Sequence, residues 1–163
     1  MRIIRQRQIV EDGWQHVADA DPLPASGDVI VSLARWQRER EVLCGRSGGR
    51  VGVRLPNDRP LSEIAPDLAQ ISLVAIEFPK YRDGRGMSLA RLLRQRHGFH
   101  GEIRAVGNVL RDQMAYLERC GFDAFELTPG KSLESALEAF DEISVTYQDA
   151  VEARSVPRYG RSR

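Results

Sequence analysis

The residues most able to bind a ligand gather in one short loop, which reads KYRDGRG from Lys80 to Gly86. It holds three cations and two glycines, whereas the whole chain of 163 residues has a formal net charge of only +1. An arginine can grip an oxyanion through two parallel N–H groups, and glycines allow backbone N–H groups to approach an anion closely. The loop therefore predicts a binding site for a small anion or for an acidic partner.

This loop has the strand–loop–helix setting of a phosphate-binding turn. It follows the apolar run SLVAIEF and precedes the amphipathic pattern SLARLLR, so a helix N-terminus should add its positive dipole end. The loop matches neither the dinucleotide fingerprint nor the GK[ST] signature of nucleotide-binding loops. A tight turn is the competing interpretation, with Asp83 and Gly84 at its corner, Ser88 as the helix N-cap and the arginines solvated or paired with Asp83.

A second loop, VGNVLRDQ, supplies further polar residues. Asn108 is expected to cap a helix, with Arg111 and Asp112 in its first turn. An arginine at that place opposes the helix dipole, which hints at a ligand anion or a neighbouring carboxylate. The predicted anion or partner site consists of Lys80, Arg82, Asp83, Gly84, Arg85, Gly86, Ser88, Asn108 and Arg111.

Two carboxylates, Glu77 and Asp112, are the candidates for acid–base chemistry. Glu77 ends an apolar run, and burial there would raise its pKa towards a value suited to proton transfer. The alternative is a structural ion pair between Glu77 and an arginine, for example Arg104 or Arg54. The catalytic residues, and whether the chain is an enzyme, stay open at this point.

Alternating strands and helices must position these residues. Five short apolar runs alternate with helical patterns of about ten residues: DVIVSL, RVGVRL, SLVAIEF, EIRAVG and DAFEL. Such alternation predicts parallel βαβ units, and five units suit a three-layer, flavodoxin-like α/β sheet rather than a complete (β/α)8 barrel. The mostly continuous apolar runs also suggest that both faces of the sheet are covered.

This topology sorts residues between the two edges of the sheet. Loops that follow strands lie at the carboxyl edge, where ligands bind, and both polar loops belong there. His16 falls in an expected N-terminal hairpin, and four other reactive residues fall near helix C-termini, at the opposite edge: Cys44, His97, His100 and Cys120. We therefore predict no metal site and no nucleophilic histidine or cysteine, and leave open whether the two cysteines lie close in space.

Composition divides the chain into four segments: a small β-hairpin at 1–19 with Asp12-Gly13 as its turn, a linker at 20–27, an α/β domain at 28–147 and a basic, mobile tail at 148–163. No apolar stretch reaches the roughly 18–20 residues of a membrane span, and the chain opens without a signal-peptide pattern. Two cysteines suggest a reducing compartment, so we expect a cytoplasmic location. Near-neutral charge argues against nucleic-acid binding.

The segment from about residue 50 to residue 147 closely resembles the bacterial family called domain of unknown function 934. The resemblance rests on three ordered blocks, FPKYRDGRGMSLARLLR, GEIRAVGNVLRDQ and RCGFDAF. Members of that family are commonly labelled as oxidoreductases probably involved in sulfite reduction.

The resemblance implies a cytoplasmic accessory role in assimilatory sulfate and sulfite reduction, with sulfite reductase or its electron donor as the expected partner. It supplies no catalytic residues. Two alternatives stay open: an oxidoreductase or other enzyme that uses a phosphorylated cofactor or a sulfur oxyanion, and a structural scaffold. A flavodoxin-like sheet can hold a flavin phosphate at its carboxyl edge, so a flavin or nucleotide cofactor also stays open, as does the oligomeric state.

Overall fold

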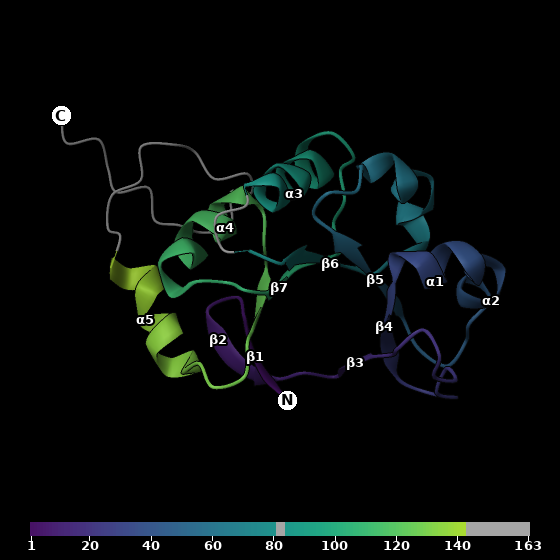
Figure 1. Cartoon of the computed structure of the whole chain (residues 1–163), viewed down its shortest axis with the longest axis horizontal. Helices are drawn as coiled ribbons and strands as arrows, with labels where there is room; N and C mark the ends of the chain where they lie inside the picture. The colour runs from purple at the N-terminus through teal and green to yellow at the C-terminus, as the bar shows by residue number, and fades with distance from the viewer. Residues whose placement is uncertain (81–83, 143–163) are drawn as a thin grey trace.

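The protein is built on one eight-stranded sheet that curls strongly (Figure 1). The computed structural model describes residues 1–80 and 84–142. The strands are β1 (Arg2–Arg5), β2 (Gln8–Glu11), β3 (Trp14–His16), β4 (Asp28–Ser32), β5 (Val51–Pro56), β6 (Leu73–Phe78), β7 (Glu102–Gly107) and β8 (Ala124–Leu127). Their order across the sheet is β2-β1-β8-β7-β6-β5-β4-β3, and β3 to β8 are all parallel.

The N-terminal hairpin exists, but its strands are not the expected ones. β1 and β2 pair antiparallel around Gln6 and Arg7, which have positive φ angles of 49° and 59°. The Asp12-Gly13 dipeptide instead leads into β3, which pairs parallel with β4. β1 also pairs with β8, so the hairpin extends the main sheet.

Within the described residues, five α-helices and three 3₁₀ segments accompany the strands, and all but the last helix lie between strands. They are α1 (Leu33–Arg38), α2 (Arg40–Cys44), η1 (Leu61–Glu63), η2 (Ala65–Gln70), α3 (Arg85–Gln95), η3 (Arg111–Gln113), α4 (Met114–Cys120) and α5 (Leu133–Glu142). Between β5 and β6 the helical segment consists of η1 and η2 and is short and irregular, as Pro66 indicates, because its ring disfavours a continuous α-helix. Among the described residues, no helix has the length and apolar character that a bilayer span requires.

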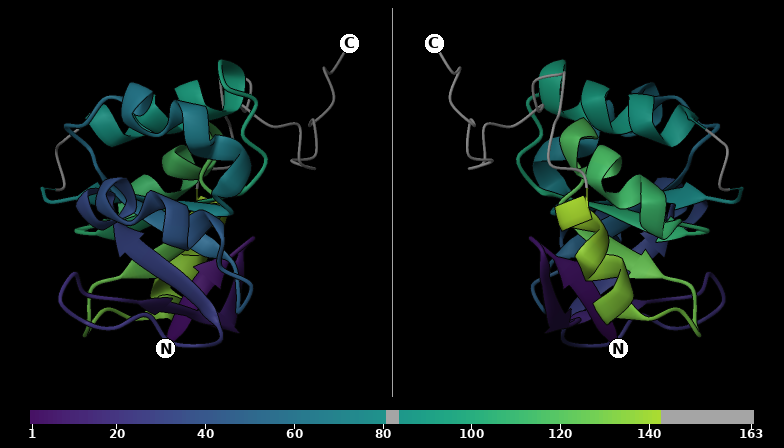
Figure 2. Two further views of the ribbon diagram at one scale, coloured as in Figure 1. Left: turned by 90° about the vertical axis from the view of Figure 1, so that its right-hand side faces the viewer. Right: turned by 90° about the vertical axis from the view of Figure 1, so that its left-hand side faces the viewer.

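The mixed α/β class is confirmed, but the sheet differs from the flavodoxin-like arrangement that we expected. From β3 to β8 the strand order follows the chain without reversal. Right-handed crossovers then place all the connecting helices on one face of the sheet, whereas a flavodoxin-like sheet reverses its order and is covered on both faces. In Figures 1 and 2 the helices lie around the outside of the curled strands.

The two faces of the sheet bury different residues. On β6 the outward side chains Val74, Ile76 and Phe78 join the main core beneath the helices. The alternate residues Leu73 and Ala75 instead join a small cluster inside the curl. The expectation that both faces are covered by helices is therefore not confirmed for the described residues, and the concave face is free to carry a site.

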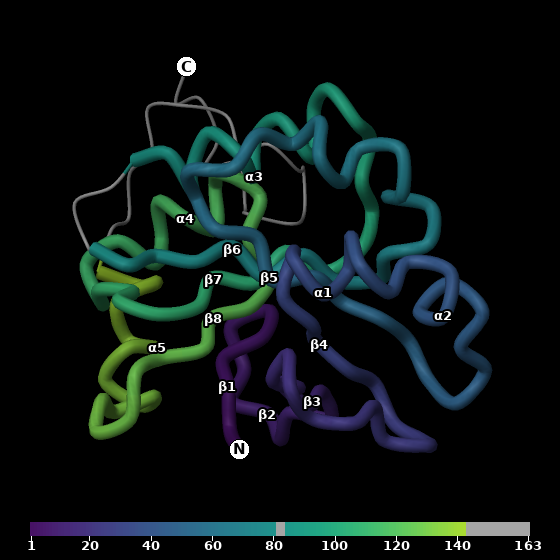
Figure 3. Tube along the Cα trace, turned by 45° about the vertical axis from the view of Figure 1, so that its right-hand side comes forward, coloured from purple at the N-terminus to yellow at the C-terminus, as the bar shows by residue number. Residues whose placement is uncertain are grey.

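The curl brings distant strands together, as the trace in Figure 3 shows. His16 at the end of β3 lies within hydrogen-bonding distance of Glu126 on β8, although β4, β5, β6 and β7 separate these strands in the sheet. The arrangement resembles an incomplete parallel barrel. In such barrels the carboxyl ends of the strands form the usual place for a ligand.

Candidate functional site at the mouth of the curled sheet

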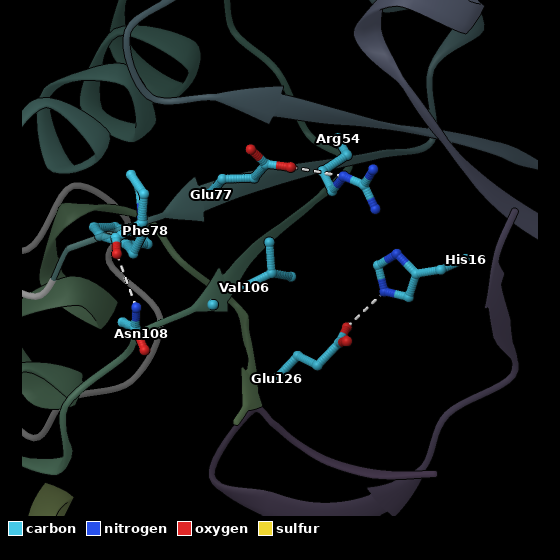
Figure 4. A pocket seen from close by; sticks show the side chains of 9 residues that line it. His16, Arg54, Glu77, Phe78, Val106, Asn108 and Glu126 are labelled. Atoms are coloured by element: carbon cyan, nitrogen blue, oxygen red, sulfur yellow. Dashed lines mark hydrogen bonds and ion pairs between the residues drawn. The ribbon is translucent and has the colours of Figure 1, made fainter. Parts of the chain in front are cut away.

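An open pocket of about 380 Å³ lies at the carboxyl ends of the parallel strands (Figure 4). Pockets that bind small molecules typically measure about 300–1,000 Å³. Its lining residues come from β3, β5, β6, β7, β8 and the loops that follow β6 and β7: His16, Arg54, Glu77, Phe78, Pro79, Val106, Gly107, Asn108 and Glu126.

Strand periodicity explains why charged side chains meet there. In a strand, alternate residues point to the same face, so Glu77 on β6 lies on the concave face with Leu73 and Ala75. The register pairs Glu77 with Val106 and Val106 with Glu126, which sets the two carboxylates at one level of the curl. Arg54 reaches the same opening from β5.

Arg54 and Glu77 form an ion pair across neighbouring strands, with 2.6 Å between Nε and a carboxylate oxygen. Pairing of Glu77 with Arg54 was one of the two expected alternatives to an acid–base role. The short contact of this pair is made by Nε of the guanidinium. In Figure 4 one of its two terminal nitrogens is directed towards His16, and within residues 1–80 and 84–142 the structure shows no hydrogen bond to either of them.

His16 and Glu126 form the opposite wall of the pocket. The Nε2 atom of His16 lies 2.9 Å from a carboxylate oxygen of Glu126. The same oxygen lies 3.4 Å from Arg104. Burial tends to raise the pKa of Glu126, but the hydrogen bond and charge of His16, together with Arg104, outweigh it and hold that pKa below its usual range.

Deeper in the curl, a buried ion network supports this wall. Arg104 on β7 is fully buried and makes two hydrogen bonds to Asp12, of 2.7 and 2.9 Å, and one of 2.9 Å to Glu102. Arg5 adds contacts of 3.6 Å to Asp12 and 3.0 Å to Glu102. Two arginines and two carboxylates thus balance in charge, and Asp12 ties the segment before β3 to the middle of the sheet.

The electrostatics of the network favour its ionised form. Burial alone would raise the pKa of Asp12 and lower that of Arg104. Their mutual hydrogen bonds and charges more than reverse both effects, so the pKa of Asp12 is lowered and that of Arg104 is raised. The network is therefore a fixed, charged floor beneath the pocket.

The glycine-rich loop lies only partly within the described residues. Arg82 and Asp83, two members of the predicted site, fall outside them, whereas Lys80 and Gly84 are exposed. Arg85 is the first residue of α3 and is also exposed. The structure thus places the start of a helix at this loop, as expected, but does not place these cations in the pocket lining.

Two residues of this loop have structural explanations. A Cβ on Gly86 would lie 2.7 Å from the Phe78 ring, so close packing of α3 on β6 requires glycine there. The competing tight-turn interpretation made Ser88 the helix N-cap, and the structure contradicts that part of it. Gly84 occupies the N-cap position and the exposed Ser88 lies inside the first turn, because α3 begins three residues earlier than its apolar pattern suggested.

Asn108 lies in the pocket wall but does not cap a helix as expected. Its side-chain nitrogen donates to the Pro79 carbonyl at 2.8 Å, and its backbone N–H donates to the Phe78 carbonyl at 2.8 Å. Leu110 occupies the N-cap position of the segment that follows. Asn108 therefore holds the chain after β6 against the end of β7.

Arg111 and Asp112 lie away from this pocket. Arg111 makes a bidentate pair with Glu142 and donates from Nε to the Ser135 carbonyl at 2.8 Å, which fastens α5 to η3. The hydrogen bond with Glu142 raises the pKa of Arg111. The neighbouring carboxylate that we named as an alternative thus explains this arginine. Asp112 is 87% exposed and is not brought together with Glu77.

A family model described as "Bacterial protein of unknown function (DUF934)" matches residues 52–157. The chain belongs to this family. No curated protein matches the sequence.

The DUF934 match covers β5 to β8 and therefore Arg54, Glu77, Arg104 and Glu126, but it begins after His16. The predicted site did not include His16, which we assigned to the hairpin, nor Arg54, Arg104 and Glu126. A usable signal was present, because the strand sequences carry charges on one alternating set of positions: Arg54, Glu77, Glu102, Arg104 and Glu126. Strands covered by helices on both faces would lack such charges.

The cysteines take no part in this site. Cys44 is exposed and Cys120 is buried, and neither forms a disulfide. The part of the chain that the structure describes contains no group of three or more histidine, cysteine or acidic residues arranged to hold a metal ion.

Proposed function

We propose that this DUF934 protein is a cytoplasmic accessory protein of assimilatory sulfate and sulfite reduction, and that it binds a small oxyanion at the mouth of its curled sheet. The link to sulfite comes from the label carried by the family that the sequence resembles. The observation that supports the binding site is the position of Arg54, whose terminal nitrogens face an open pocket at the carboxyl edge.

The geometry of Arg54 suits an oxyanion in two ways. The ion pair with Glu77 fixes the guanidinium through Nε and so lowers the conformational cost of binding. The two terminal N–H groups then remain as a fork that can donate parallel hydrogen bonds to two oxygens of one anion. An oxyanion is the ligand class that uses such a fork most fully.

The size of the pocket leaves room for more than a bare anion. A volume of about 380 Å³ lies in the range of pockets that bind metabolites and cofactors. The oxyanion can thus be free sulfite or sulfate, or the charged end of a larger molecule such as a nucleotide or a flavin. In each of these cases an anionic group binds to Arg54, and binding experiments distinguish a free oxyanion from a nucleotide or a flavin.

Calorimetric titration with sulfite, sulfate, adenosine monophosphate and flavin mononucleotide tests the proposal. We expect at least one of them to bind, and Arg54→Gln to weaken that binding at least tenfold, because loss of a charged bidentate contact costs about 1.5–3 kcal/mol. Arg59→Gln is the matched control, because Arg59 lies just after β5, close in sequence to Arg54, but pairs with Glu63 outside the pocket. Absence of binding by all four ligands, or equal loss in both variants, would overturn the proposal.

Two alternatives, docking onto a partner enzyme and oxidoreductase activity, predict different experimental results. A protein that docks onto sulfite reductase or its electron donor should be retained with that enzyme from extract at low salt, and Lys80→Glu should reduce retention. An oxidoreductase should consume sulfite when a reduced electron donor is supplied. If Arg54→Gln grows normally on sulfate and only lowers the melting temperature, a scaffold role replaces the proposed binding function.

A further inference from the structure

The charges around the pocket do not favour an anion while His16 is neutral. The buried network beneath it balances, since Arg5 and Arg104 face Asp12 and Glu102. At the rim, the charges are one cation and two carboxylates: Arg54, Glu77 and Glu126. The rim therefore carries a formal charge of −1 with neutral imidazole and zero with imidazolium.

We infer that the pocket takes up its oxyanion together with one proton, and that His16 carries this proton. The inference rests on the proposed function and deepens it, because it states how an anion enters a rim that contains two carboxylates. Protonation cancels the excess negative charge at the rim and adds a second cationic donor opposite Arg54.

The geometry assigns separate roles to the two ring nitrogens of His16. Nε2 lies 2.9 Å from Glu126, and this contact fixes a hydrogen on Nε2 as a donor to the carboxylate. Nδ1 lies on the side of the ring that faces Arg54 (Figure 4). A proton from solvent adds to Nδ1, and the resulting N–H can donate to the oxyanion that Arg54 holds. No other bond forms or breaks.

Each charged group that faces His16 has an identifiable effect on its proton. Glu126 on β8 favours the imidazolium directly, and Glu77 on β6 favours it from the far side of the pocket. Arg54 on β5 and Arg104 on β7 oppose it. An oxyanion on Arg54 reverses the effect of that arginine, so binding raises the proton affinity of His16. By linkage, the proton strengthens anion binding by the same factor.

Sulfate is the best probe, because it remains a dianion at neutral pH and so takes up no proton itself. Calorimetric titrations in two buffers with different ionisation enthalpies count the protons taken up on binding. Above about pH 7.5 we expect close to one proton per sulfate, and an affinity that falls by up to about tenfold for each pH unit. These measurements use the unmodified protein, so they do not depend on a variant folding.

His16→Gln should remove the dependence, because the amide can still donate to Glu126 but cannot take up a proton. Its sulfate affinity should stay constant with pH and lie below that of the unmodified protein wherever the unmodified protein takes up a proton on binding. His97→Gln is the control at the opposite edge of the sheet. Sulfate binding without proton uptake, or a pH dependence that survives His16→Gln, would overturn this inference and leave the proposed function intact. No sulfate binding at about pH 6 overturns it too, whereas the proposed function fails if none of its four ligands binds or if Arg54→Gln and Arg59→Gln weaken binding equally.

Discussion

His16 on β3 and Glu126 on β8 lie 2.9 Å apart, although four strands stand between theirs in the sheet. Only a strongly curled sheet can make this contact. The contact joins a segment outside the DUF934 match to a strand inside it, so the family segment and the N-terminal segment build one pocket together. The charged floor around Arg104 fixes the same curl from below, and this gives the first prediction.

Arg104→Ala should destabilise the protein by about 3–5 kcal/mol, because it leaves Asp12 and Glu102 in place with much less compensating charge. Chemical denaturation followed by circular dichroism measures the change. Arg2→Ala is the control, since its contact with Glu134 is exposed and should contribute nothing measurable. A loss below about 1 kcal/mol for Arg104→Ala would show that the network does not hold the curl.

Those parts of the fold that depend on local sequence patterns could be predicted from the sequence. The five runs that we assigned as strands are strands, because β-branched runs between turn residues are a local signal. The curl was missed because it depends on strand order and on which face the crossovers cover, and helical periodicity is the same in both arrangements. The charges on Arg54, Arg104 and Glu126 could have indicated an uncovered face, since strands buried on both sides are almost wholly apolar.

The hairpin turn shows a different limit of sequence reasoning. Asp12-Gly13 carries the stronger turn signal, yet the chain turns at Gln6 and Arg7 with positive φ angles. Arg7 makes a bidentate contact with Glu118 on α4, at 2.7 and 3.1 Å, so a tertiary contact helps to offset an unfavourable local conformation. Such compensation lies 111 residues away and leaves no local pattern.

Acid should weaken the fold through Asp12 and Glu126. Both pKa values are lowered in the folded protein from reference values of 3.8 and 4.5. A carboxylate with a lowered pKa stabilises the fold above its unfolded pKa, and this contribution is lost as pH falls through the folded value. Stability should therefore decline below about pH 4.5, and Glu126→Gln should make that decline shallower. Denaturation curves between about pH 6 and pH 3 check this.

If the stability of Glu126→Gln declined as steeply in acid as that of the unmodified protein, carboxylates other than Glu126 would account for the loss of stability at low pH. Asp112→Asn provides the comparison, because Asp112 is 87% exposed and should leave the curve unchanged.

Gly86→Ala separates a packing role from a ligand-binding role in the glycine-rich loop. The added methyl group would lie 2.7 Å from Phe78 and 3.2 Å from Ile76, so α3 must move away from β6. Overpacking of this kind costs about 1–3 kcal/mol. We expect a lower melting temperature with unchanged sulfate affinity in the folded fraction. Gly84→Ala meets no atom within 4 Å and should be nearly neutral. A variant at Gly86 that kept its stability but lost anion binding would restore the phosphate-loop interpretation.

Arg111 provides a last test, because it was predicted from sequence as an anion ligand but contacts Glu142 and the Ser135 carbonyl in the structure. A side chain that is already engaged on both edges of its guanidinium has little left to offer a ligand. Arg111→Ala should therefore loosen α5, seen as faster amide hydrogen exchange in that helix, without changing the affinity for sulfate. Glu142→Ala should loosen α5 to a similar degree, and the double variant should add little, because both changes remove the same pair. Loss of sulfate binding in Arg111→Ala but not in Glu142→Ala would instead place the anion at Arg111 and move the binding site away from Arg54.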